Sequence, residues 1–195
     1  IFGRFYVLHV ANAITYLGRQ HLTNLFELIA QFNELNRTHY DIIYGDTDSI
    51  FVHFVDDDSI EQLYNLTMRL KREKISEKER KKVENRVYAR VDQLLNFINT
   101  QLPKGMQLEL EDIAYRIIFQ PGRKKAYGYV SALDGELKVK GFEAIRGDWT
   151  EMAKRIQLKV IDIILRSRDL STAMETAKQF VREECRALLK SSVED

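Results

Sequence analysis

Two carboxylates lie one residue apart in the segment YGDTDS, where Asp46 and Asp48 flank a threonine. Carboxylate oxygens are the ligands that hard divalent cations such as Mg²⁺ take from proteins, with sites kept for water and substrate phosphates. Two such ions about 3.5–4 Å apart can stabilise the attacking and leaving oxygens of a displacement. The pair alone is weak evidence, because an Asp-x-Asp tripeptide also suits a polar hairpin tip.

The residues around this pair predict a β-hairpin. Residues 40–44 (YDIIY) and 50–55 (IFVHFV) are rich in β-branched and aromatic residues, and the segment GDTDS between them has the composition of a turn. A turn designed for stability alone would favour Asn-Gly. Two charges at the end of apolar strands therefore favour a metal-binding role over a plain polar tip.

Two further groups of charged residues have less specific patterns. Glu109 and Glu111 alternate with leucines, which predicts a strand with one acidic face. Lys124 and Lys125 lie in a segment, residues 116–127, that has four basic residues and no acidic one. Taken alone, the two glutamates suit a solvated strand face as well as they suit a site, and the two lysines favour a plain surface pair.

The hairpin segment YGDTDSIFV resembles the third polymerase motif of family B DNA polymerases, which lies in the palm. Four other segments resemble motifs of the same family in the same order, and together they cover most of residues 5–190. These are the palm helix after the fingers (AITYLGR, 13–19), the acidic palm strand (LELE, 108–111), the Lys-Lys-x-Tyr motif (KKAY, 124–127) and the archaeal-type thumb entry (141–149).

The resemblance implies a role for each matching residue. Asp48 is expected to bind both of two Mg²⁺ ions, and Asp46 to be a neighbouring carboxylate of the same catalytic and metal site. Glu109 and Glu111 are expected near the metals. The turn-shaping residues are Gly45, Thr47 and Ser49, and the residues expected to bind DNA are Lys124, Lys125, Tyr127 and Arg146.

By resemblance, the reaction is DNA-templated transfer of a deoxynucleotide from a dNTP to a primer 3′ end. The family's first palm motif, its fingers motif and its exonuclease domain have no counterpart in the sequence. We therefore expect a larger polypeptide partner that carries them, as in a split polymerase or a fragment of a longer one. Primer–template DNA is a further expected partner, and whether a sliding clamp is another stays open. We expect the chain alone to extend no primer and to self-associate.

Hydrophobic periodicity predicts an α+β fold. Three-to-four-residue spacing favours a first helix over residues 5–35, and capping boxes at Ser59, Ser76 and Asp148 predict further helix starts. Another helix is expected near Ser171. Strands are predicted over residues 107–113, 115–119, 125–130 and 136–139. With the resemblance, this pattern implies an antiparallel palm sheet with packed helices over 1–140 and the start of a helical thumb over 141–195.

Composition limits the class of protein. The chain has 195 residues, 45% of them hydrophobic, which is enough for a core and excludes a disordered tail. No apolar run approaches a membrane span of about 20 residues. The single cysteine, Cys185, excludes an internal disulfide, and a cytoplasmic location is expected. The net charge of +1 does not indicate nucleic-acid binding, and the basic run at 71–86 favours a solvated helix face over a phosphate-binding patch.

Two other functions compete with a polymerase part. One is a non-catalytic accessory or structural subunit that keeps the fold, although its retention of Asp46 and Asp48 beside the lysine pair argues against it. The other is a metal-dependent nuclease, which needs more converging carboxylates or a histidine than His53 supplies. A primer-extension assay with the missing portion added separates the three.

Overall fold

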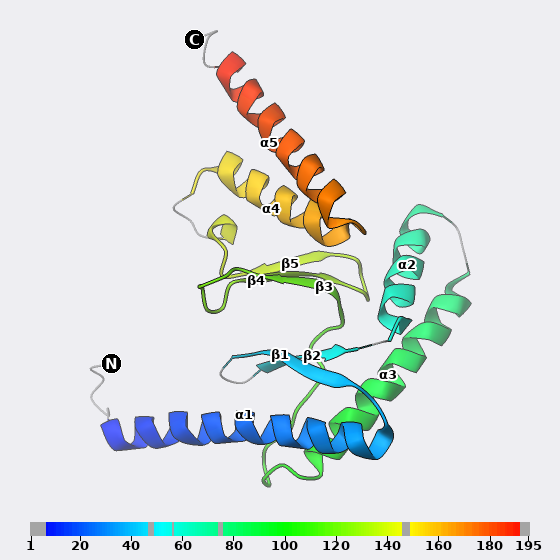
Figure 1. Cartoon of the computed structure of the whole chain (residues 1–195), viewed down its shortest axis with the longest axis vertical. Helices are drawn as coiled ribbons and strands as arrows, with labels where there is room; N and C mark the ends of the chain where they lie inside the picture. Colours follow the sequence, from blue (N-terminus) through cyan, green and yellow to red (C-terminus); the bar gives the residue numbers. More distant parts are fainter. Residues whose placement is uncertain (1–6, 47–48, 56, 74–75, 146–148, 192–195) are drawn as a thin grey trace. The chain divides into compact units, whose positions relative to one another are not determined.

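The computed structural model has an α+β fold with two small antiparallel sheets, ordered β1-β2 and β3-β4-β5 (Figure 1). No helix of its described part is long and apolar enough to cross a membrane. The structure describes residues 7–46, 49–55, 57–73, 76–145 and 149–191.

The chain divides into two compact units. Unit 1 comprises residues 1–59 and 84–111, and unit 2 comprises 60–83 and 112–195. Unit 2 thus holds the three-stranded sheet as well as the C-terminal helices, so these units do not follow a division at residue 140. Compact units of this chain need not coincide with the domains of a larger polymerase, and the palm and thumb assignment stays a prediction.

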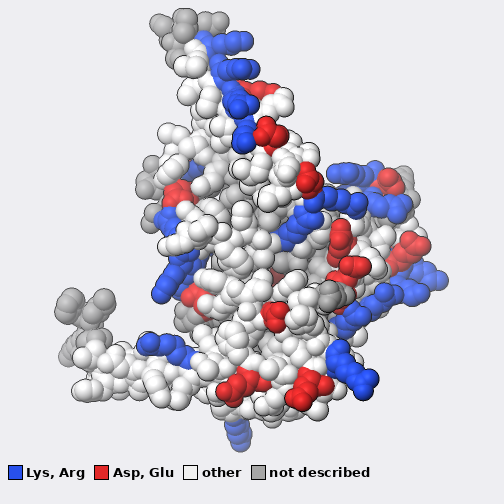
Figure 2. Space-filling view, in the orientation of Figure 1, with Lys and Arg blue, Asp and Glu red and all other residues white. Residues whose placement is uncertain are grey.

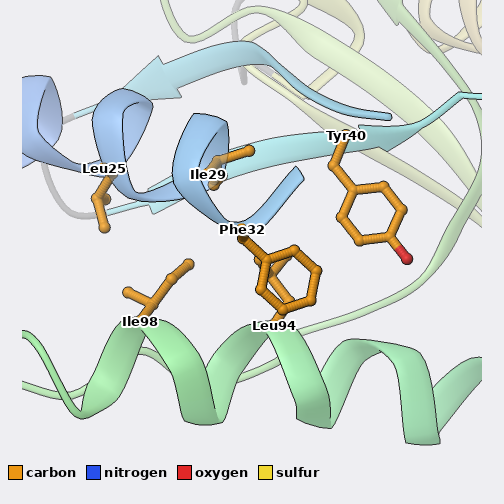
Figure 3. Packing of buried hydrophobic residues seen from close by; sticks show 6 residues of the cluster. All are labelled: Leu25, Ile29, Phe32, Tyr40, Leu94 and Ile98. Atoms are coloured by element: carbon orange, nitrogen blue, oxygen red, sulfur yellow. The ribbon is translucent and has the colours of Figure 1, made fainter. Parts of the chain in front are cut away.

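The core of unit 1 lies between two helices and the hairpin. It contains α1 (Leu8–Asn36), β1 (Tyr40–Asp46), β2 (Ser49–Phe54) and most of α3 (Glu77–Asn99). Apolar side chains of α1 and α3 face one another, and the Tyr40 ring closes one end of the cluster (Figure 3). The buried members are Leu25, Ile29, Phe32, Tyr40, Leu94 and Ile98.

An asparagine side chain pairs with the backbone after each of the two helices. The amide of Asn33 donates to the Tyr40 carbonyl at 2.9 Å and accepts from the Tyr40 N–H at 2.9 Å. Asn99 does the same for Leu108, at 3.0 and 2.8 Å. The strand predicted over 107–113 is therefore wrong, since the backbone at Leu108 pairs with a side chain instead of a neighbouring strand.

The core of unit 2 lies between a sheet and helices. The strands are β3 (Ala114–Phe119), β4 (Tyr127–Ser131) and β5 (Leu137–Lys140), close to those predicted. They are followed by the short helix η1 (Glu143–Ile145), α4 (Glu151–Arg166) and α5 (Leu170–Ser191). Helix α4 covers one face of the sheet (Figure 1) and buries Ile161 and Leu165.

Helix α2 (Ser59–Arg72) and the start of α3 attach to the β4–β5 turn within unit 2. The Thr67 hydroxyl donates to the Ala132 carbonyl at 2.9 Å, and the Arg80 guanidinium donates to the Leu133 carbonyl at 2.7 Å. Lys71 forms an ion pair with Glu136. Figure 2 shows Lys and Arg side chains gathered over α2 and the start of α3. The basic run is thus only partly a solvated face, because Lys71 and Arg80 bind the turn.

Helix starts differ from two of the predicted capping boxes. The Asp57 carboxylate, not the Ser59 side chain, accepts a hydrogen bond at the start of α2, from the Ser59 N–H at 2.9 Å. At α4 the N-cap is Thr150, whose hydroxyl accepts from the Ala153 N–H, and Asp148 lies outside the described residues. Ser76 precedes α3 as predicted, and its hydroxyl accepts from the Lys78 N–H at 3.3 Å.

Candidate active-site hairpin and basic loop

Asp46 is the last residue of β1 and pairs with Ser49, the first residue of β2. The Ser49 hydroxyl donates to the Asp46 carbonyl at 3.3 Å, which ties the two strand ends together at the turn. Asp46 is half-buried. Two of the predicted turn residues, Thr47 and Asp48, lie outside the described residues.

A β-bulge interrupts the hairpin register between Ile42 and Tyr44. Ile42 pairs with Val52, but Tyr44 pairs with Phe51, so that Ile43 is the extra residue of β1. Bulges bend a strand and re-aim the residues after it. The sequence contains no signal for this bulge, and it lies between the packed base of the hairpin and Asp46.

Gly45 lies within β1 next to Asp46, not in the turn where it was expected. It does not adopt a positive φ, and a Cβ at this position would meet its nearest atoms in Ile50 and Ser49 at 3.7 and 3.8 Å, which is ordinary contact. Glycine is therefore not required there by the packing of the described residues. A glycine in a strand can also mark a place where a ligand or another backbone approaches closely.

Glu109 and Glu111 are both exposed, whereas the alternating Leu108 and Leu110 are half-buried. The predicted alternation of faces is thus present without a strand. Within the described ranges, no three or more His, Cys, Asp or Glu side chains come together as a group that could hold a metal ion. The structure accordingly does not gather Glu109, Glu111 and Asp46 into a metal site among those residues.

A charged contact behind the hairpin was not found from the sequence. Asp57 follows β2 and forms an ion pair with Arg90 of α3. Burial alone raises the pKa of Asp57, but hydrogen bonds from Ser59 and Arg90 outweigh it and hold that pKa below its usual value. Burial raises the pKa of the neighbouring Tyr40 hydroxyl. The only sequence signal is the acidic run Asp56-Asp57-Asp58, which does not say which carboxylate is used.

In unit 2, the Lys-Lys-x-Tyr segment forms the loop that leads into β4. Lys124 and Lys125 are exposed. Tyr127 is only 7% exposed, and its ring packs near Phe119, with ring centroids 6.3 Å apart, and lies 5.8 Å from the Lys140 ammonium. The lysines thus lie at the surface of the loop, whereas the tyrosine ring mainly packs the sheet. Arg146 lies outside the described residues.

The sequence model of DNA polymerase family B matches residues 2–88 and 80–194. These two matches include the hairpin, the exposed glutamates and the basic loop. The chain belongs to DNA polymerase family B.

Family B relatives from archaea match along nearly the whole chain. DNA polymerase 2 of Aeropyrum pernix is 28% identical over 181 residues, which are 93% of this chain and 17% of that protein. DNA polymerase 1 of Pyrococcus abyssi is 30% identical over 91% of this chain and 18% of its own length. The DNA polymerase of Methanocaldococcus jannaschii is 27% identical over 98% of this chain and 9% of its own length. The chain therefore spans less than a fifth of these relatives.

A solved family B structure has a similar fold. The DNA polymerase of Pyrobaculum calidifontis superposes with a TM-score of 0.61 and 25% identity, over 96% of this chain and 18% of that one. The similarity thus extends from the sequence motifs to the arrangement of helices and strands.

Proposed function

We propose that this chain is part of a DNA-directed DNA polymerase and supplies the metal-binding hairpin and a primer–template grip. The observation that carries the proposal is the family B match along both units, with the half-buried Asp46 at the end of a packed hairpin. The archaeal relatives that match the chain are themselves named DNA polymerases.

We assign the metal site to Asp46 and Asp48. The chemistry of the donors supports this, because Mg²⁺ prefers carboxylate oxygens and binds through one or two carboxylates together with water and substrate phosphates. When bound, two Mg²⁺ ions would neutralise charge that develops on the reacting phosphate. Asp48 is the proposed shared ligand and Asp46 its neighbour. Gly45, Thr47 and Ser49 are proposed to shape the turn. Glu109 and Glu111 are kept as carboxylates that approach the metals only in the complete site.

We assign the grip on DNA to Lys124 and Lys125, because both side chains are exposed on one loop. Lysine is a compact point charge that suits a phosphate and reads no base sequence. Tyr127 is proposed to support the loop through its packing. Arg146 is proposed to contact the primer strand, by its place in the thumb-entry motif.

We further propose that the N-terminal half of α1 binds a larger polypeptide that carries the remaining palm strand, the fingers and the exonuclease. Val10, Ile14 and Leu17 are each at least 50% exposed, and Arg19 is the single Lys, Arg, Asp or Glu among residues 7–26. Figure 2 shows this part of α1 as mostly uncharged surface. An apolar face of this kind is typical of an interaction site, and the relatives have more than four-fifths of their length beyond the matched part.

The test is primer extension with the chain alone and after addition of the missing portion, in Mg²⁺ with all four dNTPs. We expect no extension by the chain alone and extension by the assembly. Asp48→Ala in the assembly should remove nearly all activity, and Asp46→Ala should reduce it less. Asp41→Ala, an exposed carboxylate on the same hairpin, is the matched control and should leave activity unchanged.

Each other outcome overturns a stated part of the proposal. Wild-type activity in Asp48→Ala would refute the metal assignment and favour the accessory-subunit alternative, since the fold would then matter without its carboxylates. Robust extension by the chain alone would refute the need for a partner. Cleavage of the DNA without extension would favour the nuclease alternative.

A further inference from the structure

The backbone of the basic loop has an unusual conformation at Lys125. Its φ is +63°, in the left-handed region that non-glycine residues seldom occupy. Arg37 is the other such non-glycine residue in the described part, and it ends helix α1, where this conformation is common. Lys125 follows no helix. A backbone held in a sparsely populated region needs surrounding contacts that fix it there.

Gly141 supplies the closest of these contacts. Its own φ is +71°, and a Cβ at this position would lie 2.0 Å from the Lys125 carbonyl oxygen, 2.7 Å from its carbonyl carbon and 2.9 Å from the Ala126 Cα. The two backbones therefore cross with no room for any side chain at residue 141. This crossing holds the peptide between Lys125 and Ala126 in place, immediately before β4.

An ion pair holds the same loop at Arg123. The Arg123 guanidinium binds the Glu143 carboxylate, and the Glu143 side chain is only 17% exposed. Glu143 begins η1, and the next residue, Ala144, donates its N–H to the Gln157 side chain of α4 at 2.6 Å. The loop is thus linked through η1 to the helix that covers the sheet.

We propose that Gly141 and the Arg123–Glu143 ion pair are positioning residues that preset Lys124 and Lys125 for a DNA phosphate. The inference rests on the proposed function of the two lysines. A loop fixed before binding loses less conformational entropy when it binds. The strained backbone at Lys125 and the two contacts that hold it are thereby explained together.

Because Glu143 is negatively charged, the direction in which DNA affinity changes when that charge is removed tests this inference. By long-range electrostatics alone, removing a negative charge beside the lysines should strengthen the binding of DNA, because the phosphate backbone is negative. If Glu143 positions the loop, removing its charge should weaken binding instead. The two explanations predict opposite changes for one substitution.

The experiment measures the affinity of the 195-residue chain for a fluorescent primer–template duplex by anisotropy, from low to moderate salt. Glu143→Gln should weaken binding about threefold to tenfold and lower the salt slope by roughly one counterion, the share of one lost phosphate contact. The matched control is Glu175→Gln, which removes an exposed carboxylate of the same unit that also pairs with a lysine. The control should bind equally or more tightly.

Further variants separate the inference from the function on which it rests. The reversed pair Arg123→Glu with Glu143→Arg should regain most of the lost affinity, and Gly141→Ala should lose it as Glu143→Gln does. Lys124→Ala and Lys125→Asn test the lysines themselves, and asparagine tolerates the left-handed conformation.

The results of these variants distinguish failure of the positioning inference from failure of the proposed function of the lysines. If the lysine variants weaken binding but Glu143→Gln tightens it or leaves it unchanged, the positioning inference is refuted and the DNA grip stands. If the lysine variants change neither affinity nor salt slope, or the wild-type chain shows no salt-dependent binding, the proposed function of the lysines is refuted.

Discussion

Replacement of Asp57 should destabilise the base of the hairpin that carries Asp46. Its carboxylate accepts the Ser59 N–H at the start of α2 and pairs with Arg90 of α3. One side chain thus joins the end of β2 to two helices. Asp57→Ala removes both interactions, whereas Asp57→Asn keeps an oxygen for the Ser59 N–H and loses the charge.

The expected loss follows from the two contacts. A helix-capping hydrogen bond contributes about 1 kcal/mol. The Arg90 side chain is 41% exposed, so its pairing with Asp57 is screened and contributes about 1 kcal/mol. Asp57→Ala should therefore lower the free energy of unfolding by about 2 kcal/mol, and Asp57→Asn by about 1 kcal/mol. A loss of 2 kcal/mol moves a urea midpoint by about 1 M.

The stability that the Asp57 carboxylate contributes should fall as the pH is lowered. The pKa of Asp57 is lowered in the folded chain, so the folded state favours the ionised carboxyl. Its contribution is complete above the unfolded pKa of about 3.9 and disappears as the pH falls through the lower folded pKa. The difference in free energy of unfolding between the wild type and Asp57→Asn should therefore shrink as the pH falls below about 5.

Urea unfolding at pH 7 and at several values below pH 5 tests both expectations. The matched control is Asp58→Asn, an exposed neighbour, which should change stability by less than about 0.5 kcal/mol. An Asp57→Ala midpoint equal to that of the control, or parallel acid profiles for wild type and Asp57→Asn, would refute the role given to this carboxylate.

Three other changes have expected outcomes. Ile98→Ala should cost about 2–5 kcal/mol in urea unfolding, because it opens a cavity in the core of unit 1, whereas Leu35→Ala, at 72% exposure, should cost little. Thr67→Val should cost about 1–3 kcal/mol, since it leaves the buried Ala132 carbonyl without its hydroxyl donor; an unchanged midpoint would contradict that contact. Thr150→Ala should lower stability by about 1 kcal/mol through the lost N-cap of α4, and should do so without changing DNA affinity.

The hairpin and most helices could be predicted because their signals are local. Tyr40 and Ile42 are covered more than Asp41 between them, as alternation along a strand requires up to the bulge. Val87, Val91, Leu94 and Ile98 are buried on one stripe of α3, as their spacing predicts. This spacing of apolar residues can be read from the sequence without the structure.

The contacts that fix the site depend on residues distant in sequence, and no periodicity encodes them. Asn99 replaces a strand neighbour for Leu108, so a correct alternation led to an incorrect strand. The choice of Asp57 within its acidic run depends on Arg90, 33 residues later. The glycine at 141 is visible in the sequence, but the carbonyl that it must accommodate belongs to Lys125.

The placement of Asp46 follows from how little a two-stranded sheet can support by itself. An isolated hairpin is marginally stable in water, so β1 and β2 depend on the faces that they share with α1 and α3. Phe32 and Tyr40 stack with ring centroids 5.8 Å apart, and Tyr40 and Phe54 at 4.1 Å, so the aromatic packing lies at the base of the hairpin. Asp46 lies at the opposite end of β1 from Tyr40. Apolar packing at one end of the hairpin is therefore what allows the Asp46 carboxylate to be held at the other.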